Sequence, residues 1–447
     1  MRVHDFLDEG LGHSSYLVDF GNDTAALIDP PRFPVEHEQL AAALDLSITW
    51  TIDTHSHADY ITGSPVVAAR HRAVFIAPGA SRLAVPHHPV SDNAKIQVAP
   101  NVTLIAIATP GHTPDHHAYL FEEDGVATAL FTGGSLMVGT VGRTDLCGPE
   151  MAAPLAHEMF HALRRLNALP DDLAVYPTHG AGSFCSAPGA TERTTTLGHE
   201  RKTNVLFGVA DEDDFVRLLV AGFGTFPSYF SRLPEINRLG PVRYDTVPRL
   251  RALTMADVEQ AVASDAVIVD GRPLHRFAAR HLAGSIANTL RPVFASWVGW
   301  LVDPHRPIVV VLDDDQSPAE AVRQCLDVGH EHFVGVLPGE AMHVQPPSLV
   351  FASINLVDPA HLETIVIDVR QANEYATGHL PGAINIELGQ IAARTIESQS
   401  VSIMCGHGER AMTAASILAS RGHHVTVLDG GPETWATATQ RSLTVGR

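Results

Sequence analysis

The stretch His55-Ser56-His57-Ala58-Asp59 follows Trp50-Thr51-Ile52, a run typical of a buried β-strand. Because side chains alternate along an extended chain, His55 and His57 are expected on one side, and a turn can bring Asp59 to the same point. Two imidazoles and a carboxylate that converge at a strand end are donors suited to a transition metal. The stretch therefore predicts a metal site at the end of a strand.

Two further histidines follow strand-like runs in the same way. His112 comes after residues 102–106, and His179 comes after Val175-Tyr176-Pro177. A Pro-Gly turn before His112 directs this residue away from the strand axis. Strand-like and helix-like segments alternate up to about residue 200, which favours a layered α/β domain. The three histidine positions are expected to meet at one edge of its sheets.

Length and charge limit the architecture and the partners. A chain of 447 residues is too long for one core, so about two to four domains are expected. The formal net charge of −20 disfavours nucleic acid and anionic membranes as partners, and no apolar run reaches spanning length. The N-terminus lacks a secretory apolar core, so a cytoplasmic location is expected.

The four scattered cysteines argue against a disulfide framework. A homo-oligomer is one expectation for the assembly, which the sequence leaves open.

The second half of the chain contains an internal repeat. Asp270-Gly271-Arg272 and the later His281 are matched, at the same spacing, by Asp368-Val369-Arg370 and His379. The repeat predicts two copies of a small α/β unit. We interpret the Asp, Arg and His of each copy as scaffold residues that hold loops by hydrogen bonds and ion pairs.

The second copy has a cysteine at the end of its predicted central strand. Cys405 is followed by Gly406-His407-Gly408-Glu409 and then Arg410, and a helix-like segment is expected over Met412 to Ser420. The backbone N–H groups of such a loop favour a thiolate and would cradle a terminal persulfide anion. Arg410 is suited to stabilise an anionic substrate such as thiosulfate or sulfite. For His407, a role in specificity and plain solvent exposure both remain open.

The first copy lacks this arrangement. Counting along the repeat puts Leu312 opposite Cys405 and Ser317 opposite Arg410. The residues between them are mainly acidic and would repel an anionic sulfur donor. This copy is therefore expected to be inactive, and Cys325, which lies in its next helix-like segment, is expected in the core.

The histidine motifs resemble those of the metallo-β-lactamase superfamily, and within it they are most similar to persulfide dioxygenases and glyoxalase II. Thr62-Gly63-Ser64, Gly142-Arg143-Thr144-Asp145 and residues 179–183 fit the dioxygenases that are fused to rhodanese domains, and so do residues 227–232. Both repeat copies resemble rhodanese domains. The resemblance implies an α/β chain with three parts, which are an αββα sandwich over residues 1–245, an inactive rhodanese-like three-layer α/β domain over 251–345, and an active one over 350–447.

The resemblance also implies ligands. In the dioxygenases two histidines and a carboxylate hold the iron, and Gly134 stands where that carboxylate belongs. The expected metal is Fe(II), alternatively Zn(II), held by His55 and His112. Three outcomes are open for the vacant position: water fills it, His57 becomes a third ligand, or the metal is lost. Asp59 and His179 would then be supporting or vestigial ligands. The residues expected to help bind the thiol carrier are Arg143, Tyr229 and Arg232.

Three functions are compatible with these features. The first is oxidation of a low-molecular-weight thiol persulfide to sulfite, coupled to sulfur transfer at Cys405 with thiosulfate or sulfite as partners. The second is a zinc thioester hydrolase of the glyoxalase II type, against which Gly134 and Tyr60, which replaces a histidine, both argue. The third is a non-catalytic metallo-β-lactamase-like platform joined to an active rhodanese domain.

Overall fold

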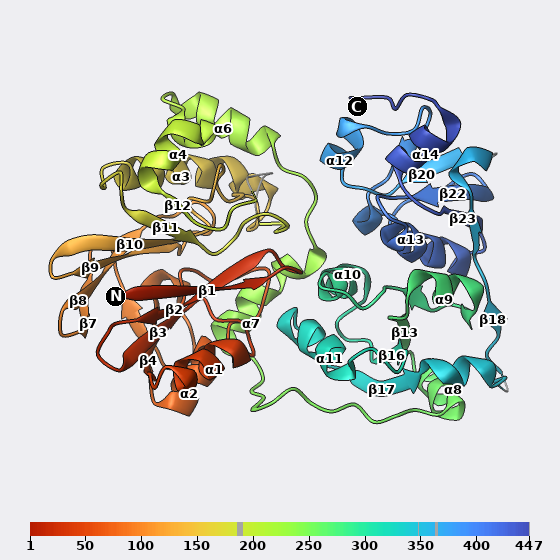
Figure 1. Ribbon diagram of the computed structural model, residues 1–447, viewed down its shortest axis with the longest axis horizontal. Helices are drawn as coiled ribbons and strands as arrows, with labels where there is room; N and C mark the ends of the chain where they lie inside the picture. Colours follow the sequence, from red (N-terminus) through yellow and green to blue (C-terminus); the bar gives the residue numbers. More distant parts are fainter. Residues whose placement is uncertain (186–190, 347, 363–364, 447) are drawn as a thin grey trace. The chain divides into compact units, whose positions relative to one another are not determined.

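The computed structural model describes residues 1–185, 191–346, 348–362 and 365–446 (Figure 1). The chain divides into two compact units, the first comprising residues 1–247 and 326–329 and the second comprising residues 248–325 and 330–447. Among the described residues, no helix combines the length and the apolar character needed to span a lipid bilayer.

Two six-stranded sheets form the first unit, in the orders β1-β2-β3-β4-β5-β6 and β12-β11-β10-β9-β8-β7. The strands of the first sheet are β1 (Arg2–Asp8), β2 (His13–Asp19), β3 (Thr24–Ile28), β4 (Ser47–Ile52), β5 (Val74–Pro78) and β6 (His88–Val90). Those of the second are β7 (Lys95–Ala99), β8 (Val102–Ala108), β9 (His117–Glu123), β10 (Val126–Gly133), β11 (Ala174–Pro177) and β12 (Thr195–Thr196).

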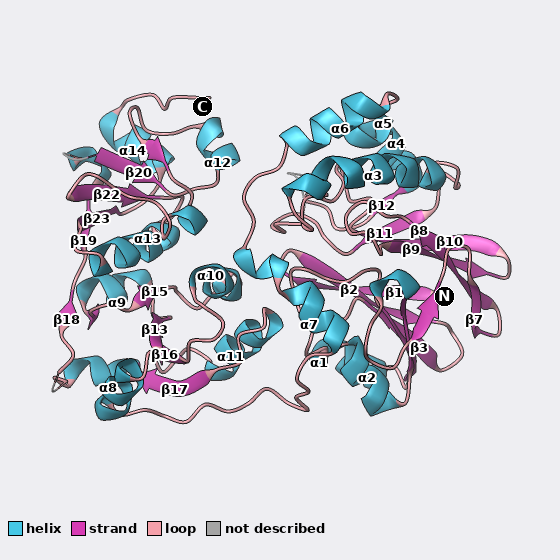
Figure 2. Ribbon diagram, turned by 180° about the vertical axis from the view of Figure 1, so that it is seen from behind, coloured by secondary structure: helices cyan, strands magenta, loops and turns pink. Residues whose placement is uncertain are grey.

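Helices cover the outer face of each sheet, as Figures 1 and 2 show. Side chains of β2 point alternately to the two faces of the sheet. Tyr16 and Val18 lie in the core between the sheets, whereas Leu17 packs with residues of α1 and α2. The second sheet shares another core with α3 to α6. The unit is therefore the expected αββα sandwich. Its helices are α1 (Val35–Ala43), α2 (Ser64–His71), α3 (Ala152–Leu166), α4 (Leu197–Thr203), α5 (Val205–Gly208), α6 (Glu212–Ala221) and α7 (Leu233–Leu239).

The loops that carry the candidate ligands follow the carboxyl ends of strands. β3 pairs with β4 in parallel, and β10 pairs with β11 in parallel. His112 and His179 follow β8 and β11, as predicted. His55 and His57 do not lie on a strand, because β4 ends at Ile52. Strand alternation was therefore the wrong reason for placing them together, and the loop after β4 brings them to the site.

The described part of the second unit contains two sheets of parallel strands, in the orders β15-β13-β16-β17 and β19-β23-β22-β20-β21. It also contains an antiparallel pair formed by β14 and β18. The strands of the first copy are β13 (Val267–Asp270), β14 (His281–Leu282), β15 (Ile286–Ala287), β16 (Ile308–Leu312), β17 (Phe333–Pro338) and β18 (Phe351–Ala352). Those of the second are β19 (Asn355–Val357), β20 (Ile365–Asp368), β21 (Ile384–Asn385), β22 (Ser400–Met404) and β23 (His424–Leu428). The helices of this part of the chain are α8 (Met255–Ala263), α9 (Leu274–Ala279), α10 (Phe294–Leu301), α11 (Pro318–Asp327), α12 (Ala372–Thr377), α13 (Glu409–Ser420) and α14 (Pro432–Thr439).

Strand register confirms the repeat. Asp270 of β13 pairs with Val311, and Asp368 of β20 pairs with Met404. The next residue along the partner strand is Leu312 in the first copy and Cys405 in the second. The first copy thus has an apolar side chain at the cysteine position. Cys325 is buried in the core of this copy, as expected.

Matching contacts in the two copies confirm the scaffold interpretation of the repeated polar residues. Arg272 donates to both carboxylate oxygens of Asp270, and Arg370 does the same with Asp368. Each arginine also donates to a backbone carbonyl eight residues onward, at 2.8 and 2.7 Å. These buried pairs tie the end of the strand to the residue that follows the next helix, and they engage Nε and Nη2 of each guanidinium group.

Candidate functional site

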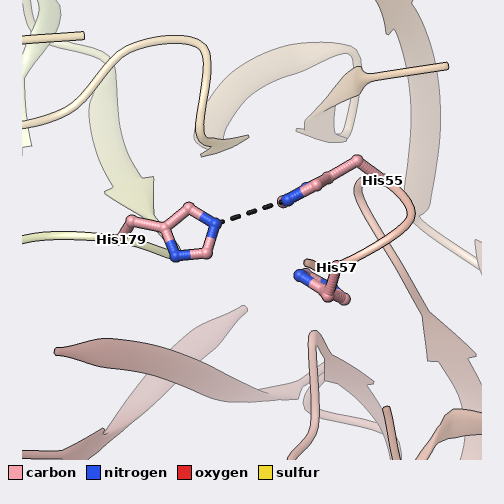
Figure 3. Close-up of side chains that lie close together, drawn as sticks. All are labelled: His55, His57 and His179. Carbon is pink, nitrogen blue, oxygen red and sulfur yellow. Dashed lines mark hydrogen bonds between the residues drawn. The ribbon is translucent and has the colours of Figure 1, made fainter. Parts of the chain in front are cut away.

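Four buried histidines from three loops form one cluster. The ring centroids of His55 and His112 are 5.0 Å apart, and those of His112 and His179 are 5.2 Å apart. His57 lies 4.2 Å from His55 by the same measure. Figure 3 shows His55 and His179 facing each other, with their Nε2 atoms 3.3 Å apart, and His57 beside them. The sequence prediction that these histidines meet is confirmed.

In the described part of the chain the donor atoms form three groups, of which two share His179 and the third consists of Asp29, Asp53 and His57. The atoms of His55, His57 and His179 lie within 4.8 Å of one another, and so do those of His112, His179 and Cys185. The expected trio of His55, His57 and His112 is not among the groups found in the described residues. His179 is therefore more central than the sequence indicated, and Cys185 was missed altogether.

Two of these buried donors have no hydrogen-bond partner among the described residues. They are Nδ1 of His57 and Nε2 of His112. Burial lowers the pKa of His112 to about 3, so its imidazole is neutral near pH 7 and Nε2 keeps a lone pair. Buried polar atoms are normally paired, and unpaired ones that point at one another suit a bound cation. These residues therefore fit a metal cofactor.

Asp29, which follows β3, orients the loop after β4. Its carboxylate accepts the Thr54 N–H at 2.7 Å and lies 3.1 Å from His57 Nε2. Thr178, next to His179, also donates to Asp29. Burial alone would raise the pKa of Asp29, but the neighbouring His57 and these hydrogen bonds lower it to about 2. The ionised carboxylate holds His57 Nε2, and the buried Nδ1 has no hydrogen-bond partner among the described residues. An acidic residue directly after an apolar strand was the available signal for this role.

Asp59 and Cys185 lie on the other side of His179. The Oδ2 atom of Asp59 is 3.3 Å from His179 Nδ1, and both side chains are buried. Asp59 thus contacts His179 rather than His55 or His57, which is consistent with a supporting role. Burial and the charge of Asp59 raise the pKa of the Cys185 thiol well above its ordinary value. A cation would offset the unfavourable proximity of these two acidic groups.

The ring of His112 occupies the space beside Gly134. A Cβ atom at residue 134 would lie 2.3 Å from His112 Cδ2 and 2.8 Å from Nε2. His112 is held in this position because its Nδ1 lies 2.8 Å from the Arg143 carbonyl oxygen. A carboxylate side chain at residue 134 is therefore excluded unless His112 moves.

Replacing Gly134 by alanine is expected to lower metal affinity by about tenfold, because the added methyl group displaces a ligand ring, and disturbing ligand orientation has effects of that order. Gly134 has no positive φ, so backbone strain does not contribute. Equilibrium dialysis with Co(II) measures the effect. Gly208→Ala is the control, since a Cβ there meets nothing within 4 Å. Unchanged cobalt affinity in Gly134→Ala would contradict the assignment of His112.

The residues predicted to bind the thiol carrier have structural contacts. Arg143 pairs with Asp145 at 2.7 Å and is almost fully buried. Tyr229 is buried in a 3₁₀ turn. Arg232 donates to the carbonyls of Gly329 and Val328 at 2.9 and 3.1 Å. Substrate binding by these three residues remains a prediction.

Cys405 lies at the junction of β22 and α13. Gly408, at a φ of 97°, directs its N–H to Cys405 Sγ, and the two atoms are 3.1 Å apart. The thiol is buried, whereas His407 is exposed. Arg410 is held by Glu374 through two bonds of 2.6 and 2.7 Å. The predicted strand–loop–helix arrangement is present, and Glu374 is a partner that the sequence did not indicate.

Comparison with known proteins agrees with these two sites. Residues 8–179 match the metallo-beta-lactamase superfamily, and residues 355–438 match the rhodanese-like domain. The chain joins a metallo-β-lactamase domain to a rhodanese-like domain. A crystal structure described as a metallo-beta-lactamase from Staphylococcus aureus is similar over 76% of this chain and 99% of its own, with a TM-score of 0.67 and 27% identity. The similarity therefore extends beyond the metallo-β-lactamase domain.

Curated relatives match the first domain. A hydroxyacylglutathione hydrolase from Synechococcus sp. is 32% identical over 36% of this chain and 62% of its own length. The human mitochondrial persulfide dioxygenase ETHE1 is 30% identical over 38% of this chain and 64% of its own. The matched segment thus spans less than two thirds of either relative. Together with the donor groups and the rhodanese-like domain, these relatives support enzymatic activity with a metal cofactor.

Proposed function

We propose that this protein is a sulfur-metabolism enzyme that oxidises a low-molecular-weight persulfide to sulfite and transfers sulfane sulfur at Cys405. The observation that carries the proposal is the Gly408 N–H bond to Cys405 Sγ, in a chain that also holds a buried histidine cluster. A hydrogen-bond donor aimed at sulfur favours the anionic forms that sulfur transfer requires. The similarity to persulfide dioxygenase ETHE1 supports the oxidative half.

The geometry of the loop supports sulfur transfer. The Cys405 thiolate attacks the outer sulfur of thiosulfate, the S–S bond of thiosulfate breaks, and sulfite leaves with the bonding electron pair. The cysteine persulfide that remains lies at the N-terminus of α13, where the helix dipole stabilises its negative charge. Glu374 fixes Arg410 beside the loop, so that the guanidinium is positioned without a conformational search.

Persulfide oxidation is assigned to the first domain. The overall reaction consumes a persulfide, dioxygen and water and yields sulfite and the free thiol. Bound iron would supply persulfide coordination and oxygen activation. The chain contributes imidazole lone pairs from the two donor groups that share His179, while Asp29 contacts the ring of His57 and Asp59 contacts the ring of His179. Burial of these groups excludes bulk water from the reacting atoms.

Thioester hydrolysis is the second candidate, because the hydroxyacylglutathione hydrolase is as similar as the dioxygenase. Two features of the cluster make it less favourable. Tyr60 is buried, and its hydroxyl donates to the Asp29 backbone carbonyl at 3.1 Å. The space beside Gly134 is filled by His112, so a carboxylate that bridges two metal ions is absent there.

Metal analysis and activity measurements on a single anaerobic preparation distinguish these functions. The full chain is purified without oxygen, its iron and zinc are measured, and O₂ uptake is followed with glutathione persulfide. We expect bound iron and persulfide-dependent O₂ uptake. Bound zinc with cleavage of an acylglutathione would instead support the hydrolase. Absence of both metals and both activities would contradict a catalytic first domain and leave the platform function.

A further inference from the structure

The anionic ligand that resemblance places at residue 134 has no room in this protein. A Cβ at Gly134 would overlap the ring of His112, which is fixed by the Arg143 carbonyl. The imidazole ligands carry no negative charge, so a divalent cation held only by them would keep its full charge in a buried environment. A negatively charged ligand from elsewhere in the fold would compensate that charge.

Cys185 is placed to be that ligand. Its Sγ, one ring nitrogen of His179 and one of His112 lie within 4.8 Å of one another. With a Zn–S bond of about 2.3 Å and a Zn–N bond of about 2.0 Å, a sulfur and a nitrogen ligand lie at most about 4.3 Å apart, so side chains at the 4.8 Å limit must move closer together to close the site. His112 Nε2 is buried and has no hydrogen-bond partner, while its Nδ1 is already occupied. The available nitrogen of His112 is therefore the one that can face a metal.

Backbone contacts hold Cys185 at this point. Its N–H donates to Ser183 Oγ at 3.1 Å, and its carbonyl accepts the Arg143 N–H at 3.0 Å. The carbonyl oxygen of Arg143 accepts a hydrogen bond from His112 Nδ1. One peptide segment thus fixes both Cys185 and His112. The loop after His179 contains a turn from Gly180 to Ser183, and this turn brings Cys185 back to the site of His179.

We propose that Cys185 replaces the missing carboxylate and binds the metal together with His112 and His179. On binding, the thiol loses its proton and a metal–sulfur bond forms. Thiolate and imidazole ligands select zinc, iron or cobalt over magnesium or calcium. Cys325 offers a contrast, because it is buried among apolar side chains such as Phe294 and Val310. The inference concerns the metal site only and does not depend on which reaction the first domain catalyses.

Cobalt(II) tests this ligand directly in the full chain. Cys147 is exposed and Cys405 lies in the other domain, so both are replaced by serine to leave Cys185 and the core residue Cys325. We expect the cobalt-loaded protein to show a sulfur-to-cobalt charge-transfer band in the near ultraviolet. X-ray absorption should show a sulfur neighbour at about 2.3 Å, a distance ordinary for metal–thiolate bonds. Adding Cys185→Ser should remove both signals.

Three results would overturn the proposal. They are a fully loaded protein with only nitrogen and oxygen neighbours, a charge-transfer band that persists in Cys185→Ser, and failure of the chain to retain cobalt. If Cys185→Ser does not fold, X-ray absorption of the cobalt-loaded protein that keeps Cys185 still shows whether a sulfur atom is bound to the metal. Loss of O₂ uptake is not used as a readout, so failure of the proposed reaction and failure of this ligand assignment are distinguishable.

Discussion

Replacing Cys405 by serine is expected to lower thiosulfate:cyanide sulfurtransferase activity by at least about a thousandfold, because the reaction loses its nucleophile. A serine hydroxyl stays protonated near pH 7 and cannot carry sulfane sulfur. The Gly408 N–H that now donates to Sγ would have a hydroxyl as its partner instead. The fold should be retained, since the change is small and the loop is held by its own backbone.

The measurement is thiocyanate formation from thiosulfate and cyanide. Cys147→Ser is the matched control, because Cys147 is exposed and belongs to the first unit. Circular dichroism and the thermal unfolding midpoint establish that both variants fold. Sulfurtransfer that survives Cys405→Ser would remove Cys405 from the reaction and with it the transfer half of the proposed function.

Replacing His179 by alanine is expected to have the largest effect on the metal centre. His179 belongs to two of the donor groups, one with His55 and His57 and the other with His112 and Cys185. Without His179, each of these two groups keeps only two candidate ligands. Removing a residue that only hydrogen-bonds to a metal ligand lowers metal affinity by about 10- to 100-fold. Removing His179, which is a candidate ligand in both groups, should therefore lower it by at least about 100-fold.

Metal content after dialysis, measured by mass spectrometry with added Fe(II) or Co(II), reports this effect. His37→Ala is the control because His37 is a buried histidine outside both groups, 2.8 Å from Ser15 Oγ and stacked on Phe6. It should lose stability without losing metal. Retention of metal by His179→Ala, at the level of the His37 variant, would show that His179 is not a ligand.

Local patterns in the sequence were sufficient for much of the architecture. In the first unit, β4, α2 and β5 follow one another along the chain, as the alternation of strand-like and helix-like segments predicted. The repeat was aligned correctly down to the residue, since strand pairing places Leu312 and Cys405 at equivalent positions. These features depend on hydrophobic runs, turns and spacing within a few dozen residues, and such short-range properties are encoded locally.

The composition of the metal site depended on contacts between distant segments. The loops after β4, β8 and β11 supply its residues, and only their packing reveals that His179, rather than His112, joins His55 and His57. The sequence argument for His55 and His57 reached the right residues through strand alternation, which the end of β4 at Ile52 rules out.

The sequence by itself determined which residue types are present, including the cysteine loop at 405–410, the H-x-H-x-D motif and the glycine at residue 134. Only the tertiary structure decided that the ring of His112 fills the space beside Gly134, that Cys185 returns to His179, and that Glu374 holds Arg410. The physical reason is that coordination and steric exclusion act over a few ångströms between residues tens of positions apart. Such distances are set by the packing of sheets and loops and are not contained in any local pattern.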